Sequence, residues 1–255
     1  MSATALTDAQ PHRGELPAFY NRYSRCSDDL YYTPETEALQ SLFRPLFATS
    51  WLIDDLLGNN CFFGAKVVVL SSASSKTAYG TAYQLAQRGG VEIVGLTSET
   101  NRSFCEDLGF YDRVVSYEEL EAMGEGLSVA YVDFAGDAKP RARIHSHFAD
   151  LKCSYIVGAT HLARTGETGS VAGPKPTMFC APSQSAKRAK EWGAAELNAR
   201  IAADWKHFCP HVERPPDTLR IVRNADAETA RQVYSTLAAG LSSPQSGHML
   251  LMACD

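Results

Sequence analysis

The feature that most constrains the fold is a continuous apolar run that leads directly into small residues. Lys66 to Leu70 (KVVVL) has the length and β-branched composition of a strand buried on both faces of a parallel sheet. Serines and one alanine follow at 71–75, and helix signals then cover Lys76 to Arg88, where Gly89 and Gly90 end them. Strand, small-residue turn and helix in this order predict the phosphate-binding unit of a nucleotide-binding α/β domain.

Strand and helix patterns keep alternating beyond this unit. Val91 to Leu96 (VEIVGL) is the second expected strand. Such alternation predicts an α/β fold, a Rossmann-type doubly wound parallel sheet with helices on both faces. Further strands are expected at 113–115, 128–133 and 153–157, and further helices at 99–108, 117–123 and 137–149.

The rest of the chain flanks this alternating part. Residues 1–60 are expected to form an N-terminal segment with a helix, Pro34 to Leu57, that Pro45 kinks and that packs on the core. Residues 61–255 are expected to form the Rossmann-type nucleotide-binding domain, its C-terminal third packing onto the same sheet. That third is expected to hold helices at 183–192, 194–208 and 227–239 and strands at 219–222 and 249–252.

Charge and hydropathy exclude several classes of partner. The net charge is -5 and the pI is about 5.8, so no basic field is present to neutralise a row of nucleic-acid phosphates. No apolar run reaches the roughly 20 residues that span a bilayer, and the polar start, Met1 to Gly14, lacks the pattern of a signal peptide. We therefore expect a cytoplasmic protein that binds neither nucleic acid nor membrane.

Cysteines and histidines give no metal signal. The seven cysteines are dispersed and none forms a C-x-x-C pair, which argues against a zinc site or a disulfide framework. Two histidine pairs, His145 with His147 and His207 with His211, have spacings that metal sites also use. Pro210 is expected to interrupt any helix that would place the second pair on one face. No metal is expected.

The small-residue turn departs from the usual dinucleotide fingerprint because G-x-G-x-x-G is absent. Hydroxyl groups replace the glycines, and a lysine adds a positive charge at the helix start, so the chemistry still fits an anion. The expected cofactor-binding residues of this turn are Ser72, Ser74, Ser75, Lys76 and Thr77. Two alternatives remain open: a serine cap with a solvent-facing lysine, or a serine-lysine hydrolase dyad, for which the S-x-x-K spacing is absent.

The end of the second strand bears on the choice of cofactor. A site that prefers NAD has an acidic residue there to bind the ribose hydroxyls, whereas this strand ends in Thr97 and Ser98. Both can donate to a 2′-phosphate, and Arg102, one turn into the next helix, could supply the countercharge. The sequence thus favours NADP(H), with the alternative that Arg102 is an ordinary solvated residue.

A family resemblance agrees with these expectations. The run VVVLSSASSKTAYGTAYQLAQRGGVEIVGLTSETNRSFCEDLGFYDRVVSYEEL resembles the cofactor domain of medium-chain dehydrogenases/reductases, in the zinc-independent quinone and enoyl reductase branch. Within that superfamily the chain is most similar to an uncharacterised family that shares several short strings. Those strings are Y-N-R-Y (Tyr20 to Tyr23), L-I-D-D (Leu52 to Asp55), S-S-A-S-S-K-T-A-Y-G (Ser71 to Gly80), V-G-A-T-H (Val157 to His161) and A-K-R-x-K-x-W-G (Ala186 to Gly193).

The resemblance implies where the nicotinamide would lie. It places this ring near the ends of the fourth and fifth strands, at Asp133 and at Gly158 to His161. Zinc is not expected on this branch. The resemblance also implies a GroES-like substrate domain ahead of the cofactor domain, and this sequence does not contain it. In the family this domain forms one wall of the cleft in which the hydride is transferred. Another chain, a second copy or the flanking segments would have to supply that wall here.

The leading hypothesis is an NADP(H)-dependent reductase of a carbon-carbon or carbon-oxygen double bond in a small molecule. Hydride delivery also needs a group that protonates or polarises the acceptor, and the candidates are His161, Tyr79 and Tyr23. The alternatives are a non-redox enzyme, such as an isomerase, lyase or cyclase, and a non-catalytic partner subunit. A homodimer is expected, because a missing substrate domain would leave an apolar edge open to water, and a separate substrate-domain subunit is the other partner considered.

Overall fold

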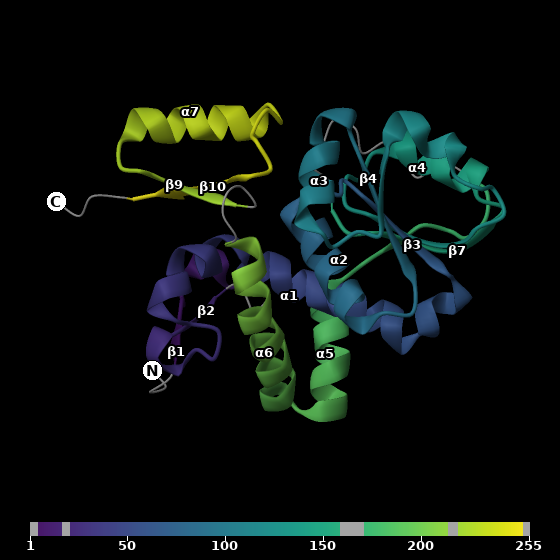
Figure 1. Cartoon of the computed structure of the whole chain (residues 1–255). Helices are drawn as coiled ribbons and strands as arrows, with labels where there is room; N and C mark the ends of the chain where they lie inside the picture. The colour runs from purple at the N-terminus through teal and green to yellow at the C-terminus, as the bar shows by residue number, and fades with distance from the viewer. Residues whose placement is uncertain (1–4, 17–20, 159–170, 214–218, 252–255) are drawn as a thin grey trace.

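The computed structural model describes residues 5–16, 21–158, 171–213 and 219–251. Its centre is a six-stranded parallel sheet in the order β5-β4-β3-β6-β7-β8 (Figure 1). The first strand of the domain lies in the middle, and the strand order reverses between β3 and β6. The strands are β3 (Val67–Ser71), β4 (Glu92–Thr97), β5 (Arg113–Ser116), β6 (Ser128–Asp133), β7 (Asp150–Ile156) and β8 (Thr177–Met178).

Helices cover both faces of this sheet, which confirms the expected Rossmann-type α/β fold. Alternate residues of β3 belong to different cores, because successive side chains of a strand point to opposite faces. Val68 and Leu70 pack in a cluster with the helices that precede and follow β3. Val67 and Val69 pack in a second cluster with α4. The helices of this part are α2 (Lys76–Arg88), α3 (Arg102–Leu108) and α4 (Ala138–His147), with 3-10 turns η6 (Glu99–Asn101) and η7 (Tyr117–Ala122).

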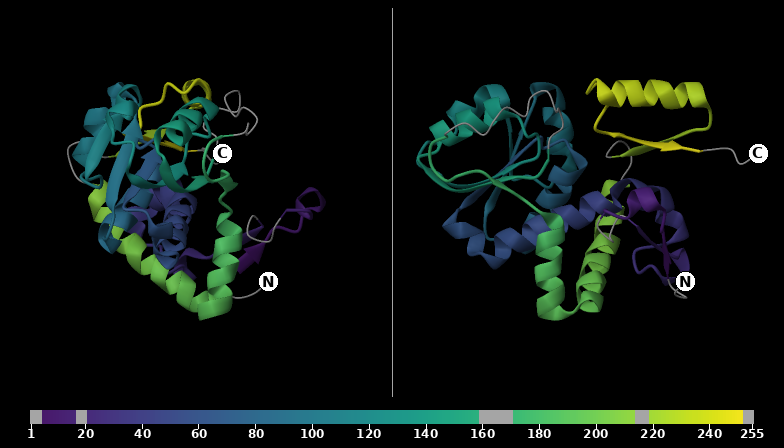
Figure 2. Two further views of the ribbon diagram at one scale, coloured as in Figure 1. Left: turned by 90° about the vertical axis from the view of Figure 1, so that its right-hand side faces the viewer. Right: turned by 180° about the vertical axis from the view of Figure 1, so that it is seen from behind.

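Three further helices thicken one face of the domain. The long helix α1 (Glu37–Asn59) continues through Pro45 and packs along α2, and α5 (Ala181–Trp192) and α6 (Ala194–Val212) form an antiparallel pair beside it (Figures 1 and 2). Aromatic rings fill the contact between α1 and α6, where Phe47 lies 5.0 Å from Phe208 and 5.4 Å from Trp205 between ring centroids. Buried rings of this size contribute most of the apolar area that such a layer removes from water.

Two of the family strings hold this helical layer together. Asp54 accepts two hydrogen bonds, of 2.8 and 2.6 Å, from the guanidinium of Arg88 at the end of α2. Asp55 accepts from Arg188 (2.7 Å) and Gln184 (2.6 Å) on α5, and both members of the Asp55–Arg188 pair are buried. The strings at Leu52–Asp55 and Ala186–Gly193 thus join helices rather than form a cleft. Buried charges of this kind need their partners, because an unpaired one is costly.

The C-terminal segment forms a unit of its own. Strands β9 (Arg220–Asn224) and β10 (Ser246–Leu250) pair in parallel in a separate two-stranded sheet, joined by α7 (Ala227–Ala238). These strands do not pair with the main sheet. The expected division at residue 60, with the C-terminal third belonging to the second domain, stays a prediction. The unit rests on α1, where a Cβ on Gly247 would lie 2.5 Å from Leu42 Cδ1.

The remaining elements lie at the start of the chain and between helices. An antiparallel hairpin, β1 (Ala5–Thr7) with β2 (Arg22–Ser24), begins the described part. A 3-10 turn, η1 (Pro11–Arg13), lies between these strands, and three more come after them: η3 (Cys26–Asp28), η4 (Pro34–Thr36) and η5 (Cys61–Gly64). Within the described ranges, no helix is both long and apolar enough to cross a membrane.

Candidate nucleotide-binding site

The turn between β3 and α2 is fixed by its own backbone and by two tyrosines that pack on opposite faces of the sheet, Tyr111 on the α2 face and Tyr117 on the α4 face. Ser72 is left-handed, with φ of 48°, a conformation that costs a non-glycine residue roughly 1 kcal/mol. Its amide donates to Tyr117 Oη at 2.9 Å, and Tyr111 donates to the carbonyl of Ala73 at 2.7 Å. Ser75 caps α2 by accepting from the amide of Ala78. The sequence analysis missed both tyrosines, because nothing in their spacing links them to this turn.

The same turn leaves hydrogen-bond donors open. Within the described part of the chain, the amides of Lys76 and Thr77 have no hydrogen-bond acceptor, as is usual in the first turn of a helix. Ser74 Oγ accepts from Asn101 Nδ2 at 3.2 Å, so its own hydrogen is free to donate. Amides at a helix N-terminus together with a hydroxyl form a ready site for an anion. The turn lies where the strand order reverses, the usual ligand position in such sheets.

The lysine side chain does not face this opening. Lys76 Nζ donates to the carbonyl oxygens of Pro244 at 3.2 Å and Ser246 at 3.0 Å, both in the segment that joins α7 to β10. Burial lowers the pKa of the Lys76 ammonium from its ordinary value. The positive charge expected at a phosphate is therefore held by the C-terminal unit in this structure.

The corner after β4 also differs from the expectation. Thr97 is buried and Ser98 is partly exposed at the strand end. Arg102 Nε lies 3.2 Å from Glu99, and its guanidinium also pairs with Glu119. A 2′-phosphate at this corner would have to compete with two carboxylates for the arginine. At least one of the two glutamates, Glu99 or Glu119, would have to move away before Arg102 could pair with the 2′-phosphate.

A cavity of about 450 Å³ lies between this corner and the loop that follows α7. Its walls carry hydroxyl and amide groups, and no ionisable side chain among the described residues lines it. From the β4–α3 side it is lined by Ser98, Thr100, Asn101, Ser103 and Phe104, and from the C-terminal side by residues 240–245.

Asp133, at the end of β6, stabilises the loop in which it lies. One oxygen of its carboxylate accepts from Ser71 Oγ at 3.0 Å and from the amides of Ala135 and Gly136, and the other accepts from Arg141 at 2.9 Å. Its side chain is 1% exposed, so all of its contacts are internal. Next to it, the amide of Val157 donates to the Asp133 carbonyl. The ends of β6 and β7 thus lie side by side, with Gly158 just beyond, and the nicotinamide position expected there stays a prediction.

The three candidate proton donors have very different positions. His161 lies outside the described residues. Tyr79 is fully buried between Phe43 and Phe104, and burial raises its pKa well above the ordinary value. A substrate cannot contact it there. Tyr23 is 53% exposed on β2, in a hairpin that lies apart from the six-stranded sheet (Figures 1 and 2).

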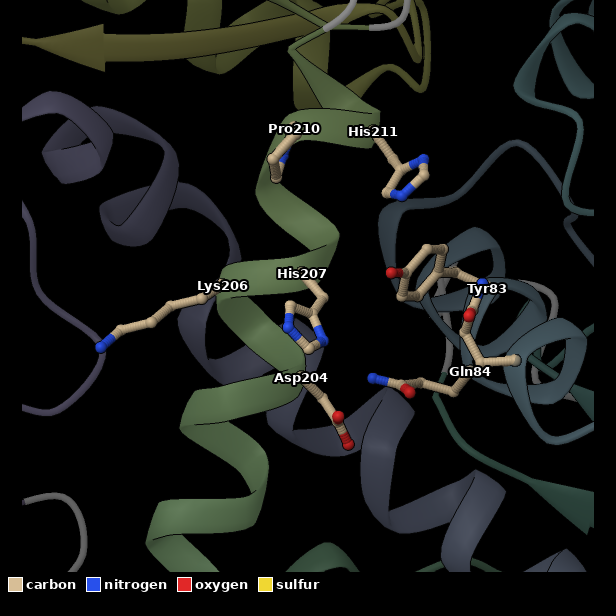
Figure 3. Close-up of a pocket in the computed structure, with 8 residues that line it drawn as sticks. Tyr83, Gln84, Asp204, Lys206, His207, Pro210 and His211 are labelled. Atoms are coloured by element: carbon tan, nitrogen blue, oxygen red, sulfur yellow. The ribbon is translucent and has the colours of Figure 1, made fainter.

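A second cavity, of about 430 Å³, lies between α2 and α6 (Figure 3). The expectation that Pro210 ends the preceding helix is wrong, since α6 runs on to Val212. Consequently His207 and His211 share one helix and line the same pocket, facing Tyr83 of α2. The described residues contain no group of three His, Cys, Asp or Glu side chains placed to hold a metal ion.

The reversed strand order, with helices on both faces of a parallel sheet, defines a Rossmann-type α/β domain. The chain belongs to the family described as "Protein of unknown function (DUF2855)", which matches residues 1–242. No curated protein matches the sequence.

Several solved structures share the fold. YhdH of E. coli K-12 with bound NADPH superposes with a TM-score of 0.54 at 14% identity, over 81% of this chain and 61% of that one. The yhdH oxidoreductase of Salmonella enterica in complex with NADP gives 0.55 at 14%, over 82% and 61%. CurA of Vibrio vulnificus in complex with NADPH gives 0.53 at 13%, over 81% and 62%. The fold implied by the resemblance is confirmed, and the chain spans about three-fifths of the length of these structures.

Proposed function

We propose that this chain binds NADP(H) and forms the cofactor part of a reductase that acts on a carbon-carbon or carbon-oxygen double bond of a small molecule. The observation that carries the proposal is the set of open donors at the β3–α2 turn, at the point where the strand order reverses. The similar structures that hold NADPH or NADP support it.

The proposed contacts follow the length of the cofactor. The amides of Lys76 and Thr77 and the hydroxyls of Ser72 and Ser74 would bind the pyrophosphate, with Ser75 as the cap of α2. Thr97, Ser98 and Arg102 would bind the ribose that carries the 2′-phosphate. The nicotinamide would lie at the neighbouring ends of β6 and β7, at Asp133 and Gly158. Bound NADPH would supply a hydride to the acceptor carbon and leave as NADP+, while a donor such as His161 supplies the proton.

Titration of the purified chain with NADPH and NADH, followed by the fluorescence of the reduced nicotinamide, tests this proposal. We expect saturable binding of NADPH, and weaker binding in a Thr77→Pro variant that lacks one of the open amides. A matched control is Thr229→Ala on α7, far along the chain from the turn. Absence of binding to either nucleotide at millimolar concentration would overturn the proposal.

A second candidate is a partner subunit that binds the nucleotide and is completed by another chain. The observation that favours it is α7, which has no buried residue and exposes Tyr234 and Leu237. A separate substrate-domain subunit or a second copy would cover this face. Reductase turnover by the isolated chain would contradict this candidate.

A further inference from the structure

The contact between Lys76 and the C-terminal unit joins residues that are 168 and 170 positions apart in the sequence. The acceptors are two backbone carbonyls, and no carboxylate among the described residues pairs with the ammonium. A lysine donates up to three hydrogen bonds and accepts none, so both contacts draw the loop toward the start of α2. Lys76 therefore fixes where the segment 244–246 lies relative to the β3–α2 turn.

That segment is continuous with one wall of the cavity beside the β4–α3 corner. Residues 240–245 face Ser98, Thr100 and Asn101 across about 450 Å³. Asn101 also donates to Ser74 of the turn, so the cavity and the turn share a boundary. A ligand that occupies the turn with its phosphates could extend into this space without leaving the protein surface.

The lining decides what kind of group fits. Hydroxyls and carboxamides come from both walls, at Ser98, Asn101, Ser242, Ser243 and Gln245, while Phe104 and Leu241 add apolar contact. Such groups match the hydroxyls of a ribose and the ring of a base, which are neutral. The two cations close to this lining are already engaged, since Lys76 donates to the Pro244 carbonyl and Arg102 is paired with two glutamates.

We propose that Lys76 is a positioning residue, which holds residues 240–245 in place as the second wall of the cavity in which the adenosine of the proposed nucleotide would lie. This inference rests on the proposed function. It assigns Lys76 a role through the C-terminal loop instead of a contact with phosphate. Removal of the ammonium would then weaken the binding of adenosine itself, which carries no phosphate.

Comparison of two probes, adenosine and NADPH, tests the inference. We expect Lys76→Met to weaken both by a similar factor, about tenfold or more, because both lose the same wall. Hydrogen exchange of the amides of Ser243, Gln245 and Ser246 should become faster in this variant. Lys76→Arg should restore part of the affinity for both probes, and Lys187→Met, an exposed site on α5, should change neither. A Ser243→Trp variant, which fills the cavity and keeps Lys76, should also weaken both probes.

The outcomes separate the possible errors. If Lys76→Met weakens NADPH and leaves adenosine unchanged, the lysine contacts phosphate and the inference is overturned. Unchanged affinity for both probes would overturn it as well. If wild type binds adenosine with the expected dependence on Lys76 and does not bind NADPH, the inference stands and the proposed function fails. If wild type binds NADPH and Ser243→Trp has no effect, the function stands and the cavity does not hold the adenosine.

Discussion

The molecule contains two units of the same local design with opposite degrees of burial. In β3–α2–β4, every residue of β3 is buried and α2 buries eight of its residues. In β9–α7–β10, the strands also run parallel and a helix also joins them, yet α7 buries none of its residues and β10 buries only Gly247. The two units thus differ in their neighbours rather than in their local pattern.

The difference teaches that a βαβ unit takes its stability from what surrounds it. The first unit has strands on either side and a core on each face, whereas a two-stranded sheet is marginal by itself in water. The second unit depends on the Leu42–Gly247 contact and on the hydrogen bonds of Lys76. A buried turn therefore faces a wall that has few buried residues of its own and that Lys76 holds in place.

The largest expected effect comes from the centre of the rigid unit. Asp133→Ala would leave Arg141 and two amides without their acceptor in a buried place, so we expect a loss of about 3–5 kcal/mol in the free energy of unfolding. Urea denaturation measures it. Arg231→Ala, which breaks an exposed ion pair on α7, is the matched control and should cost under about 1 kcal/mol. Equal losses in the two variants would contradict the claim that the β3–α2–β4 region and the C-terminal unit differ in how much their polar contacts stabilise the fold.

A smaller loss in the free energy of unfolding is expected where α1 and α2 pack closely against each other. A Cβ on Gly80 of α2 would lie 2.8 Å from Ser50 Oγ on α1, and that hydroxyl already donates to the Thr77 carbonyl. Gly80→Ala should therefore cost about 1–3 kcal/mol through overpacking. Thermal unfolding, calibrated against urea, checks it. In a Ser50→Ala background the same change should cost less, and an equal cost in both backgrounds would rule out this contact as the cause.

Acid sensitivity should also arise in the rigid domain. His145 is buried, with Nδ1 2.7 Å from the Ala172 carbonyl and Nε2 2.9 Å from Ser154 Oγ, so Nδ1 carries the hydrogen. Burial lowers its pKa below the ordinary 6.5, and nearby Arg141 lowers it further while Asp133 raises it. As the pH falls below 6.5 the unfolded chain takes up this proton first, so stability falls with pH through that window. His145→Gln should give a shallower slope in urea unfolding from pH 7 to 5. An unchanged slope would contradict the assignment.

The smallest effect is expected on α7. Tyr234→Ser and Leu237→Ser alter side chains that are 75% and 54% exposed, so the free energy of unfolding should change by no more than about 0.5 kcal/mol. Leu85→Ser, at a fully buried position of α2, is the matched control and should cost about 2–5 kcal/mol. A large loss at Tyr234 or Leu237, together with dissociation seen by light scattering, would show that a second copy covers α7 in solution.

Local pattern predicted most of the elements around the central strands, although the helix expected at 117–123 is a 3-10 turn and the short strand β8 was not expected. The helix expected at Lys76–Arg88 and the strand expected at 128–133 coincide with α2 and β6. Apolar runs, caps and glycine stops act over a few residues, so they can be read along the chain. The second half of the chain was harder, because α6 continues through Pro210 where a local rule predicts a break, and packing of Trp205, Phe208 and Val212 in the core outweighs one lost hydrogen bond.

The candidate site also has features that the sequence predicts locally and contacts that it does not predict. The sequence by itself determined that a polar turn with a lysine follows the first strand, because a turn of small residues between strand and helix is a local feature. Only the tertiary structure decided what that lysine binds and what holds the turn. Tyr117 comes from 45 residues away, and the acceptors of Lys76 come from 168 and 170 residues away. Such partners are set by how separate segments pack against one another, and no pattern along the chain encodes that distance.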